Sequence, residues 1–278
     1  MKKISRRSFM AAAAVSVAAL ALTACGGSAS SAASSVASSA ASSEAASSAA
    51  AADLSTVEAG KLTMATNAAF PPYEMTTDAG EFEGIDVDTA KAIAEKLGLE
   101  LQIDDMDFDA ALLSVQQGKA DIVMAGVTVT DERKAVMDFS DSYATGIQSI
   151  IVPSDSDIAS PDDLAGKKIG TQRGTTGYIY CSDDFGDENV VAYDDGLTAV
   201  QALNNGQVDA VVIDNAPAQE FVAANPGLKV LDTSYAEEDY AIGVAKGSAL
   251  EDAVNKALEE LKADGTLQAI VDKYINAN

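Results

Sequence analysis

Short apolar runs alternate along most of the chain with segments whose apolar residues recur at helical spacing. The alternation begins with a predicted strand over 61–66, followed by a predicted helix that stops at Gly98. Further along, we expect helices over 111–117 and 198–205, each closed by a glycine, and buried strands over 120–125 and 208–213. Strands that alternate with helices predict an α/β fold with parallel sheets covered by helices on both faces.

The two halves of this alternation are weakly similar to each other. A Gly-Lys pair precedes the first strand of each half, at Gly60 and Gly166, and a Gly-x-x-Asp pattern opens an inner strand of each half, ending at Asp121 and Asp209. We therefore expect two lobes of like architecture. In parallel sheets, ligands bind beyond the carboxyl ends of the strands. Here these ends are Asn67, 126–128, 172–176 and Asp214.

The last segment predicts two more helices. Ser248 and Glu251 match a capping box at the start of the first helix, and Gly265 follows its end. We interpret the apolar faces of both helices as core. These faces consist of Leu250, Val254, Leu258 and Leu261 in the first helix, and Leu267, Ile270, Val271 and Tyr274 in the second.

The first 24 residues have the pattern of an export signal. Four bases in the first seven residues precede an almost uninterrupted apolar run over 10–22. Because a membrane-spanning helix needs about 20 apolar residues, a transmembrane anchor is the less favoured interpretation. The ending Leu-Thr-Ala-Cys25 resembles the lipobox of bacterial lipoproteins, which implies cleavage before Cys25 and lipidation of that cysteine. The pair Arg6-Arg7 leaves the export route open between the general and the twin-arginine pathway.

Residues 26–52 are almost entirely Ser, Ala and Gly, without a helical or strand period. This composition is typical of a flexible tether, with a partly helical alanine tract as the alternative. The whole chain carries 43 acidic against 18 basic residues, a net charge of −25. Since phosphates would be repelled, we expect no nucleic-acid partner.

The cysteines indicate neither a disulfide nor a catalytic thiol. If Cys25 is lipidated, Cys181 has no partner within the chain. The chain contains no histidine that could act as the base of a catalytic cysteine. We interpret Cys181 as a small half-buried side chain.

Two charged residues near predicted strand ends suggest a ligand. The guanidinium fork of Arg133 matches a carboxylate, and Asp214 can accept hydrogen bonds from an ammonium, so together they fit the two poles of an α-amino acid. Gly126 allows close approach of the backbone. Hydroxyl and amide donors of Thr128, Thr175 and Thr176 could reach the same carboxylate, with Phe70 and Phe108 as apolar walls.

Simpler interpretations of both charges stay open at this point. Thr130 followed by two acids is typical of an N-cap and an acidic first turn, so Arg133 could be a solvated charge on a helix. Asp214 could be a turn residue before Pro217.

Five segments resemble the signature of the polar amino-acid binding proteins of ABC importers, the solute-binding proteins of family 3. They are 67–74 (NAAFPPYE), 84–88 (GIDVD), 125–133 (AGVTVTDER), 138–141 (DFSD) and 209–214 (DAVVID). The resemblance implies a type II periplasmic-binding-protein fold, with two lobes, a ligand cleft between them, and crossover strands near 143–147 and 237–241. The expected domains are a signal peptide (1–24), the lipidated cysteine with its tether (25–52), lobe 1 (53–145 and 241–278) and lobe 2 (146–240).

The resemblance also implies roles for individual residues. Arg133 holds the α-carboxylate with Gly126 and Thr128, and Asp214 holds the α-ammonium. The remaining ligand-binding residues are Asn67, Phe70, Phe108, Ala125, Gln172, Thr175 and Thr176. Relatives that bind basic amino acids often place an acid at the position of Asn67. We therefore expect an uncharged polar L-amino acid first, an acidic one next, particularly if Arg173 faces the ligand, and a basic one last.

The implied function is a lipid-anchored substrate-binding protein on the extracytoplasmic face of the cell membrane. As a monomer without cofactor, metal or enzymatic activity, it captures an amino acid by lobe closure and delivers it to an ABC permease and its ATPase. An exported dehydratase-like enzyme on the same fold and a ligand-sensing receptor subunit are the alternatives. Asp105, Asp107 and Asp109 begin like a calcium loop, but the glycine and the final glutamate of such a loop are missing.

Overall fold

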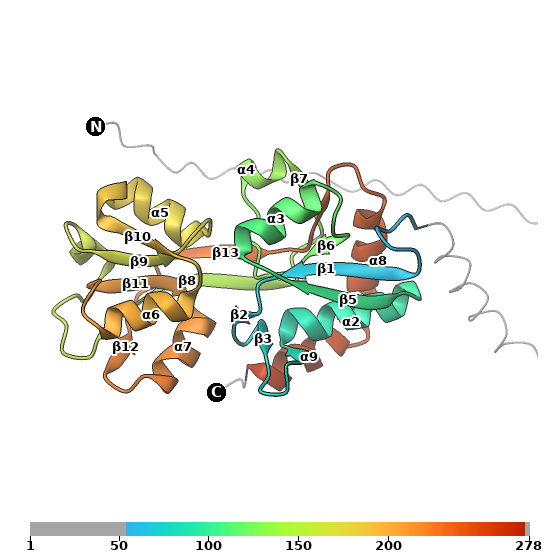
Figure 1. The fold of residues 1–278 in the computed structure, drawn as a ribbon. Coiled ribbons are helices and arrows are strands. Elements are labelled where there is room, and N and C mark those ends of the chain that lie inside the picture. Colours follow the sequence, from blue (N-terminus) through green and yellow to red (C-terminus); the bar gives the residue numbers. More distant parts are fainter. Residues whose placement is uncertain (1–53, 276–278) are drawn as a thin grey trace, which may run out of the picture. The chain divides into compact units, whose positions relative to one another are not determined.

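The computed structural model describes residues 54–275, in which two sheets and their flanking helices form two lobes. Figure 1 shows the long strands β8 and β13 running from one group of elements to the other. The export signal, Cys25 and the tether lie outside the described residues. None of the helices in 54–275 is both long and apolar enough to cross a membrane.

Lobe 1 is built around a five-stranded sheet with the order β5-β1-β6-β14-β7. Its strands are β1 (Lys61–Thr66), β5 (Glu100–Asp105), β6 (Ile122–Val123), β7 (Met137–Phe139) and β14 (Gly243–Ala245). A small sheet lies beside it, formed by β2 (Ala69–Phe70), β3 (Glu74–Thr76) and β4 (Phe82–Glu83).

Lobe 2 is built around a six-stranded sheet with the order β10-β9-β11-β8-β12, in which β13 also pairs with β8. Its strands are β8 (Ala144–Pro153), β9 (Ile169–Gln172), β10 (Val190–Tyr193), β11 (Ala210–Asp214), β12 (Leu228–Val230) and β13 (Ala236–Tyr240).

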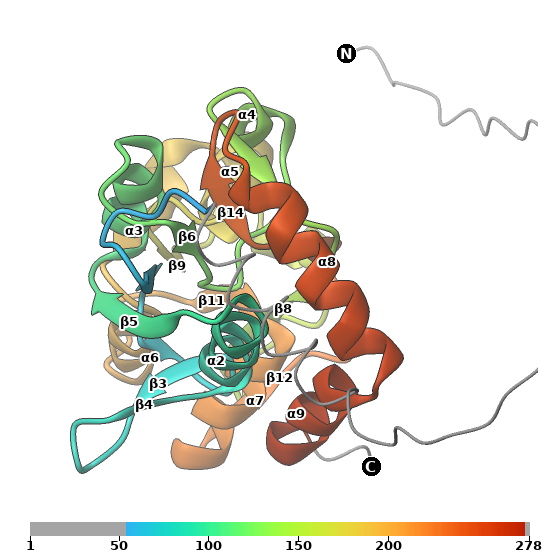
Figure 2. The ribbon, with the colours of Figure 1, turned by 90° about the vertical axis from the view of Figure 1, so that its right-hand side faces the viewer.

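Helices cover both faces of each sheet. Lobe 1 has α2 (Ile85–Leu97), α8 (Leu250–Ala263) and α9 (Thr266–Tyr274), which pack on one another (Figure 2), α3 (Phe108–Gln116) on the opposite face, and the short α4 (Asp131–Lys134). Lobe 2 has α5 (Thr176–Phe185), α6 (Gly196–Asn204) and α7 (Asn215–Ala224), with 3₁₀ turns over Pro161–Leu164 and Asp187–Asn189.

Successive strand residues pack into different clusters, as expected of sheets buried on both faces. Leu62 and Met64 of β1 belong to the cluster formed with α2 and α8, whereas Ala65 belongs to the cluster around α3. In β11, Val211 packs with α6, and Val212 packs with the α5 side chain Cys181. Cys181 is fully buried, and burial raises the pKa of its thiol to about 12, so it is a core residue with no reactive thiolate.

Both main sheets are mixed, so the expectation of parallel sheets is confirmed only for the strands β5-β1-β6 and β10-β9-β11. β1 is parallel to β5 and β6, but β14 is antiparallel to β6 and β7, and β8 is antiparallel to β11. The reason is the connection between the lobes. The chain enters lobe 2 along β8 and returns along β13 to β14, so these strands join their sheets without the helical crossover that a parallel neighbour requires.

The predicted elements exist, and the differences lie at their ends. α2 ends at Gly98, which has the left-handed conformation of a helix cap. α3 begins at Phe108, three residues before the predicted start, and β6 is shorter than predicted. The capping box at Ser248 is wrong. α8 begins after Ala249, and the Ser248 hydroxyl accepts from the amide of Leu250 instead.

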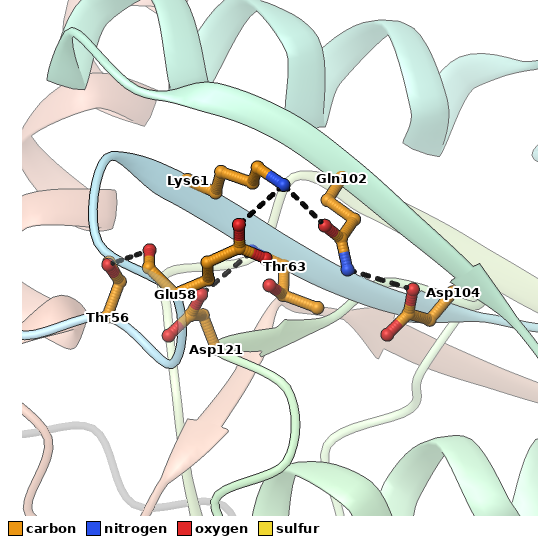
Figure 3. A network of polar contacts seen from close by, with 7 residues as sticks. All are labelled: Thr56, Glu58, Lys61, Thr63, Gln102, Asp104 and Asp121. Atoms are coloured by element: carbon orange, nitrogen blue, oxygen red, sulfur yellow. Dashed lines mark hydrogen bonds and ion pairs between the residues drawn. The ribbon is translucent and has the colours of Figure 1, made fainter.

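The weak repeat corresponds to a shared contact. Asp121 accepts hydrogen bonds from the backbone amides of Thr63 (2.8 Å) and Val57 (2.7 Å). Figure 3 shows the Asp121–Thr63 contact beside a run of polar contacts in which Lys61 joins Glu58 to Gln102. In lobe 2, Asp209 accepts from the amide of Lys168 (2.8 Å). Each repeated aspartate thus ties the start of an inner strand to the backbone of the neighbouring one.

Candidate ligand-binding site

All eleven residues that the sequence assigned to a ligand site line one cavity between the lobes. Lobe 1 contributes Asn67, Phe70, Phe108, Ala125, Gly126, Thr128 and Arg133, and lobe 2 contributes Gln172, Thr175, Thr176 and Asp214. Four lining residues were not predicted, namely Glu74, Gln148, Val212 and Ile213. The contacts that these residues make with a ligand stay a prediction.

Arg133 is a buried cation, not a solvated helix charge. Thr130 caps α4 as predicted, accepting from the Arg133 amide, but the Arg133 side chain is only 9% exposed. Its Nη1 donates to the carbonyl of Thr128 (2.8 Å), and its Nη2 donates across the lobes to the carbonyl of Gly174 (3.2 Å). The guanidinium carbon lies 5.3 Å from the centre of the Phe108 ring. Burial lowers the pKa of Arg133, but arginine stays protonated in proteins.

Asp214 ends β11 with its carboxyl group buried at the cavity. The Tyr240 hydroxyl donates to Oδ1, and Gln148 Nε2 donates to Oδ2 (2.9 Å). Burial raises the pKa of Asp214 to about 7, although the hydrogen bond from Tyr240 opposes the rise. A cation placed beside this group would favour its ionised form.

Glu74 is an acid in the cavity that strand-end reasoning did not find. It pairs with Phe70 across the β2–β3 hairpin, and both side chains reach the cavity. Glu74 is 0% exposed, and neither carboxylate oxygen has a hydrogen-bond donor within the described chain. Burial raises the pKa of Glu74 well above its usual value, and the nearby Asp86 raises it further. The sequence signal was its place in the segment 67–74, four residues after Phe70.

Gly126 and Asp86, which belong to the segments 125–133 and 84–88, contact each other beside the cavity. Gly126 has a φ of +54°, and a Cβ atom there would lie 2.8 Å from the Phe70 ring, so only glycine fits. Its amide donates to Asp86 Oδ2 (3.0 Å). Burial raises the pKa of Asp86 to about 6, and the Gly126 amide opposes this rise. Asp86 therefore holds the backbone of Gly126, which lines the cavity, without lining the cavity itself.

The threonine hydroxyls do not point as expected. Thr175 donates to the carbonyl of Gln172 (2.8 Å) and caps α5. Thr128 and Thr176 both donate to Glu238 Oε2, at 3.2 and 3.0 Å. The structure thus directs these hydroxyl protons at protein acceptors and lends no support to the expectation that they donate to a ligand carboxylate. Donation by the backbone amides of the same residues stays a prediction.

The amide of Asn67 joins the two lobes. Its Oδ1 accepts from Gln172 Nε2 (2.8 Å), and its Nδ2 donates to the carbonyl of Met106 (3.0 Å). Arg173 is 57% exposed, pairs with the exposed Asp194 at 3.6 Å, and does not line the cavity. Arg133 is thus the one cationic side chain among the lining residues.

The described residues show no built metal site. No group of three or more His, Cys, Asp or Glu side chains in 54–275 is arranged to hold a metal ion. Asp105, the first acid of the calcium-like pattern, accepts from the amide of Ala68 (2.8 Å). Its carboxylate stabilises the loop after β1.

Comparison with known proteins agrees with the motifs. The family model for bacterial extracellular solute-binding proteins, family 3, matches residues 62–277. The L-cystine-binding protein of Escherichia coli strain K12 is 33% identical over 225 residues, covering 80% of this chain and 85% of that protein. A probable histidine-binding protein of Neisseria gonorrhoeae is 34% identical over 272 residues, covering 95% and 94%.

A solved structure is similar over the same region. The arginine-, lysine-, histidine-binding protein of Geobacillus stearothermophilus superposes with a TM-score of 0.75 at 34% identity, covering 78% of this chain and 96% of that one. The match over residues 62–277 includes both sheets, the crossover strands and every residue that lines the cavity. The chain belongs to the bacterial extracellular solute-binding proteins of family 3 and has their type II periplasmic-binding-protein fold.

Proposed function

We propose that the protein captures an L-α-amino acid between its lobes and delivers it to the permease of an ABC importer. One observation carries this proposal: the buried Arg133 of lobe 1 and the buried Asp214 of lobe 2 face the same cavity. The α-carboxylate of an amino acid fits the first and its α-ammonium fits the second. A ligand held by both lobes stabilises the closed arrangement relative to the open one. Binding of the amino acid is thereby coupled to lobe closure, as delivery to a permease requires.

We infer further that the cargo carries a positively charged side chain. Arg133 and Asp214 serve the two charges of the amino-acid backbone, which leaves the buried Glu74 beside another acid, Asp86, and without a cation. A buried carboxylate is costly unless a cation or hydrogen-bond donors compensate it. The rings of Phe70 and Phe108 offer faces on which a cation packs favourably.

This inference reverses the order of cargoes expected from the sequence. That order depended on an uncharged amide at Asn67, but Asn67 is hydrogen-bonded to Gln172 and Met106, and Glu74 supplies an acid instead. The outward position of Arg173 removes the reason to favour an acidic side chain. The Geobacillus relative, named for arginine, lysine and histidine, supports a basic cargo.

A thermal unfolding experiment with single amino acids tests both steps. Protein without its signal and tether is stripped of bound ligand and melted with each L-amino acid in turn. A ligand at 1,000 times its dissociation constant adds about 4.1 kcal/mol, which raises the midpoint by roughly 8 to 16 °C for a domain of this size. We expect the largest shifts from arginine, lysine or histidine. A flat panel contradicts the carrier, and a largest shift with an uncharged amino acid contradicts only the basic cargo.

Binding should release protons below neutral pH. The α-ammonium favours the ionised form of Asp214, whose pKa is raised to about 7, and a cationic side chain does the same at Glu74. At pH 6 Asp214 is mostly protonated and must lose its proton when the ligand binds, so affinity should increase from pH 6 to pH 8. Calorimetry in buffers of different ionisation enthalpy counts the protons. No release at pH 6 would argue against ion pairing at Asp214.

The lipid anchor is a separate proposal that rests on the sequence alone, because Cys25 lies outside the described residues. The family is extracellular, which agrees with export. If Cys25 holds the protein at the membrane, the Cys25→Ser chain should leave the membrane fraction, and continued sedimentation with membranes would contradict the anchor.

A further inference from the structure

Glu238 is a buried acid on one of the strands that link the lobes. It lies on β13 opposite Gly146 of β8, is only 6% exposed, and does not line the cavity. We propose that Glu238 is a positioning residue which turns the hydroxyls of Thr128 and Thr176 into hydrogen-bond acceptors for the α-ammonium of the cargo. The proposal rests on the amino-acid-binding function proposed above.

The first support is that one carboxylate oxygen of Glu238 accepts hydrogen bonds from side chains of both lobes. Glu238 Oε2 accepts from Thr128 Oγ1 of lobe 1 (3.2 Å), and from Thr176 Oγ1 (3.0 Å) and Gln148 Nε2 (2.9 Å) of lobe 2. A β-bridge between Thr128 and Tyr240 brings the lobe 1 segment beside β13. All three donors belong to residues that line the cavity.

The second support is the proton count of a hydroxyl group. A threonine hydroxyl has one proton and two lone pairs, and an ionised carboxylate can only accept. With both protons committed to Glu238, the oxygens of Thr128 and Thr176, which lie 3.4 Å apart, can offer only lone pairs to a ligand. Such oxygens suit an ammonium and not a carboxylate.

Gln148 is oriented in the same way. Its Nε2 donates to both Asp214 Oδ2 and Glu238 Oε2, each at 2.9 Å. Its Oε1 is buried and has no donor in the described part of the chain. Together with Asp214, the Gln148 oxygen and the two threonine oxygens form a set of acceptors, and an ammonium brings three N–H donors to such a set.

A direct electrostatic role for Glu238 explains less of the geometry. The charge of Glu238 opposes the lowering of the Arg133 pKa by burial, but the nitrogens of Arg133 donate to the carbonyls of Thr128 and Gly174. Burial raises the pKa of Asp214, and the charge of Glu238 adds to the rise. When Asp214 is ionised the two neighbouring carboxylates repel each other, and an ammonium bound close to both relieves this repulsion.

The test compares two ligands that differ only in the α-ammonium, L-arginine and desamino-arginine, by calorimetry. In Glu238→Met the acceptor of these hydroxyl protons is removed, so the protons are free to turn towards the ligand and the acceptor set is lost. We expect L-arginine to bind about tenfold to a hundredfold more weakly, the scale of one charge-assisted hydrogen bond, and desamino-arginine to bind as it does to the unchanged protein. Glu237→Met, at an exposed neighbour on β13, is the matched control and should change neither affinity.

Thr176→Val provides a second variant that does not remove a buried charge. It should produce the same selective loss for L-arginine, and it should add little further loss when combined with Glu238→Met. Equal losses for both ligands, or no loss in either variant, would overturn the role of Glu238 while the wild-type protein still binds L-arginine. Failure of the wild-type protein to bind any amino acid would contradict the proposed function itself and, with it, this role.

Discussion

The Arg133→Ala protein is expected to bind its amino acid about a hundredfold or more weakly than the unchanged protein. The guanidinium offers two parallel donors to the α-carboxylate, and a hydrogen bond between charged groups contributes about 1.5 to 3 kcal/mol. Loss of both bonds corresponds to roughly 3 to 6 kcal/mol, and each 1.4 kcal/mol is a factor of ten in affinity. Titration calorimetry measures the effect directly.

Arg173→Ala is the matched control for this substitution. Arg173 is 57% exposed and lies outside the cavity, so its removal should change the affinity by less than about twofold. Arg133→Lys keeps the charge but loses the planar fork, and should therefore fall between Arg133→Ala and the unchanged protein. Near-normal binding by Arg133→Ala would refute the assignment of the carboxylate site.

The Glu74→Gln protein should change its preference among amino acids. With the buried acid replaced by a neutral amide, affinity for L-arginine should fall by about tenfold to a hundredfold, because one charge-assisted contact is lost. Affinity for L-glutamine should fall little, since the ends of both amino acids still contact Arg133 and Asp214. The ratio of the two dissociation constants measures the change in specificity without depending on overall affinity.

The same substitution also tests how Glu74 affects folding. Because the pKa of Glu74 is raised by burial, its ionisation disfavours the folded state above the ordinary carboxyl pKa, so Glu74→Gln should be no less stable at pH 8. Glu81→Gln, an exposed acid near the same small sheet, should leave both specificity and stability unchanged. An unaltered arginine-to-glutamine ratio in Glu74→Gln would remove the basis for a cationic cargo.

Much of the cavity could be predicted because ligands in such sheets bind beyond the carboxyl ends of the strands. Asn67, Gln172 and Asp214 end or follow the strands β1, β9 and β11, and the carboxyl ends of neighbouring strands meet at the same edge of a sheet. The recognised motifs added Phe70 and Phe108, which no periodicity marks as lining residues. The domain boundaries proposed from the sequence stay a prediction.

The residues that sequence reasoning missed reach the cavity by other routes. Glu74 arrives through a hairpin and Gln148 through a crossover strand, so neither follows the strand-end rule. The direction of the Thr128 hydroxyl is decided by Glu238, 110 residues further along the chain. No local pattern records such a contact, and only the folded arrangement shows whether a hydroxyl donates or accepts.

Several hydrogen bonds join lobe 1 to lobe 2 through protein groups alone, among them Asn67 to Gln172 and Arg133 to Gly174. Because no cargo side chain takes part, each bond contributes the same free energy to closure for every amino acid carried. A substitution that weakens such a contact without changing the cavity lining should therefore raise the amino-acid concentration needed for closure by the same factor for every cargo. A stronger contact between the lobes would likewise lower the concentration at which the protein closes, without changing which amino acids it binds.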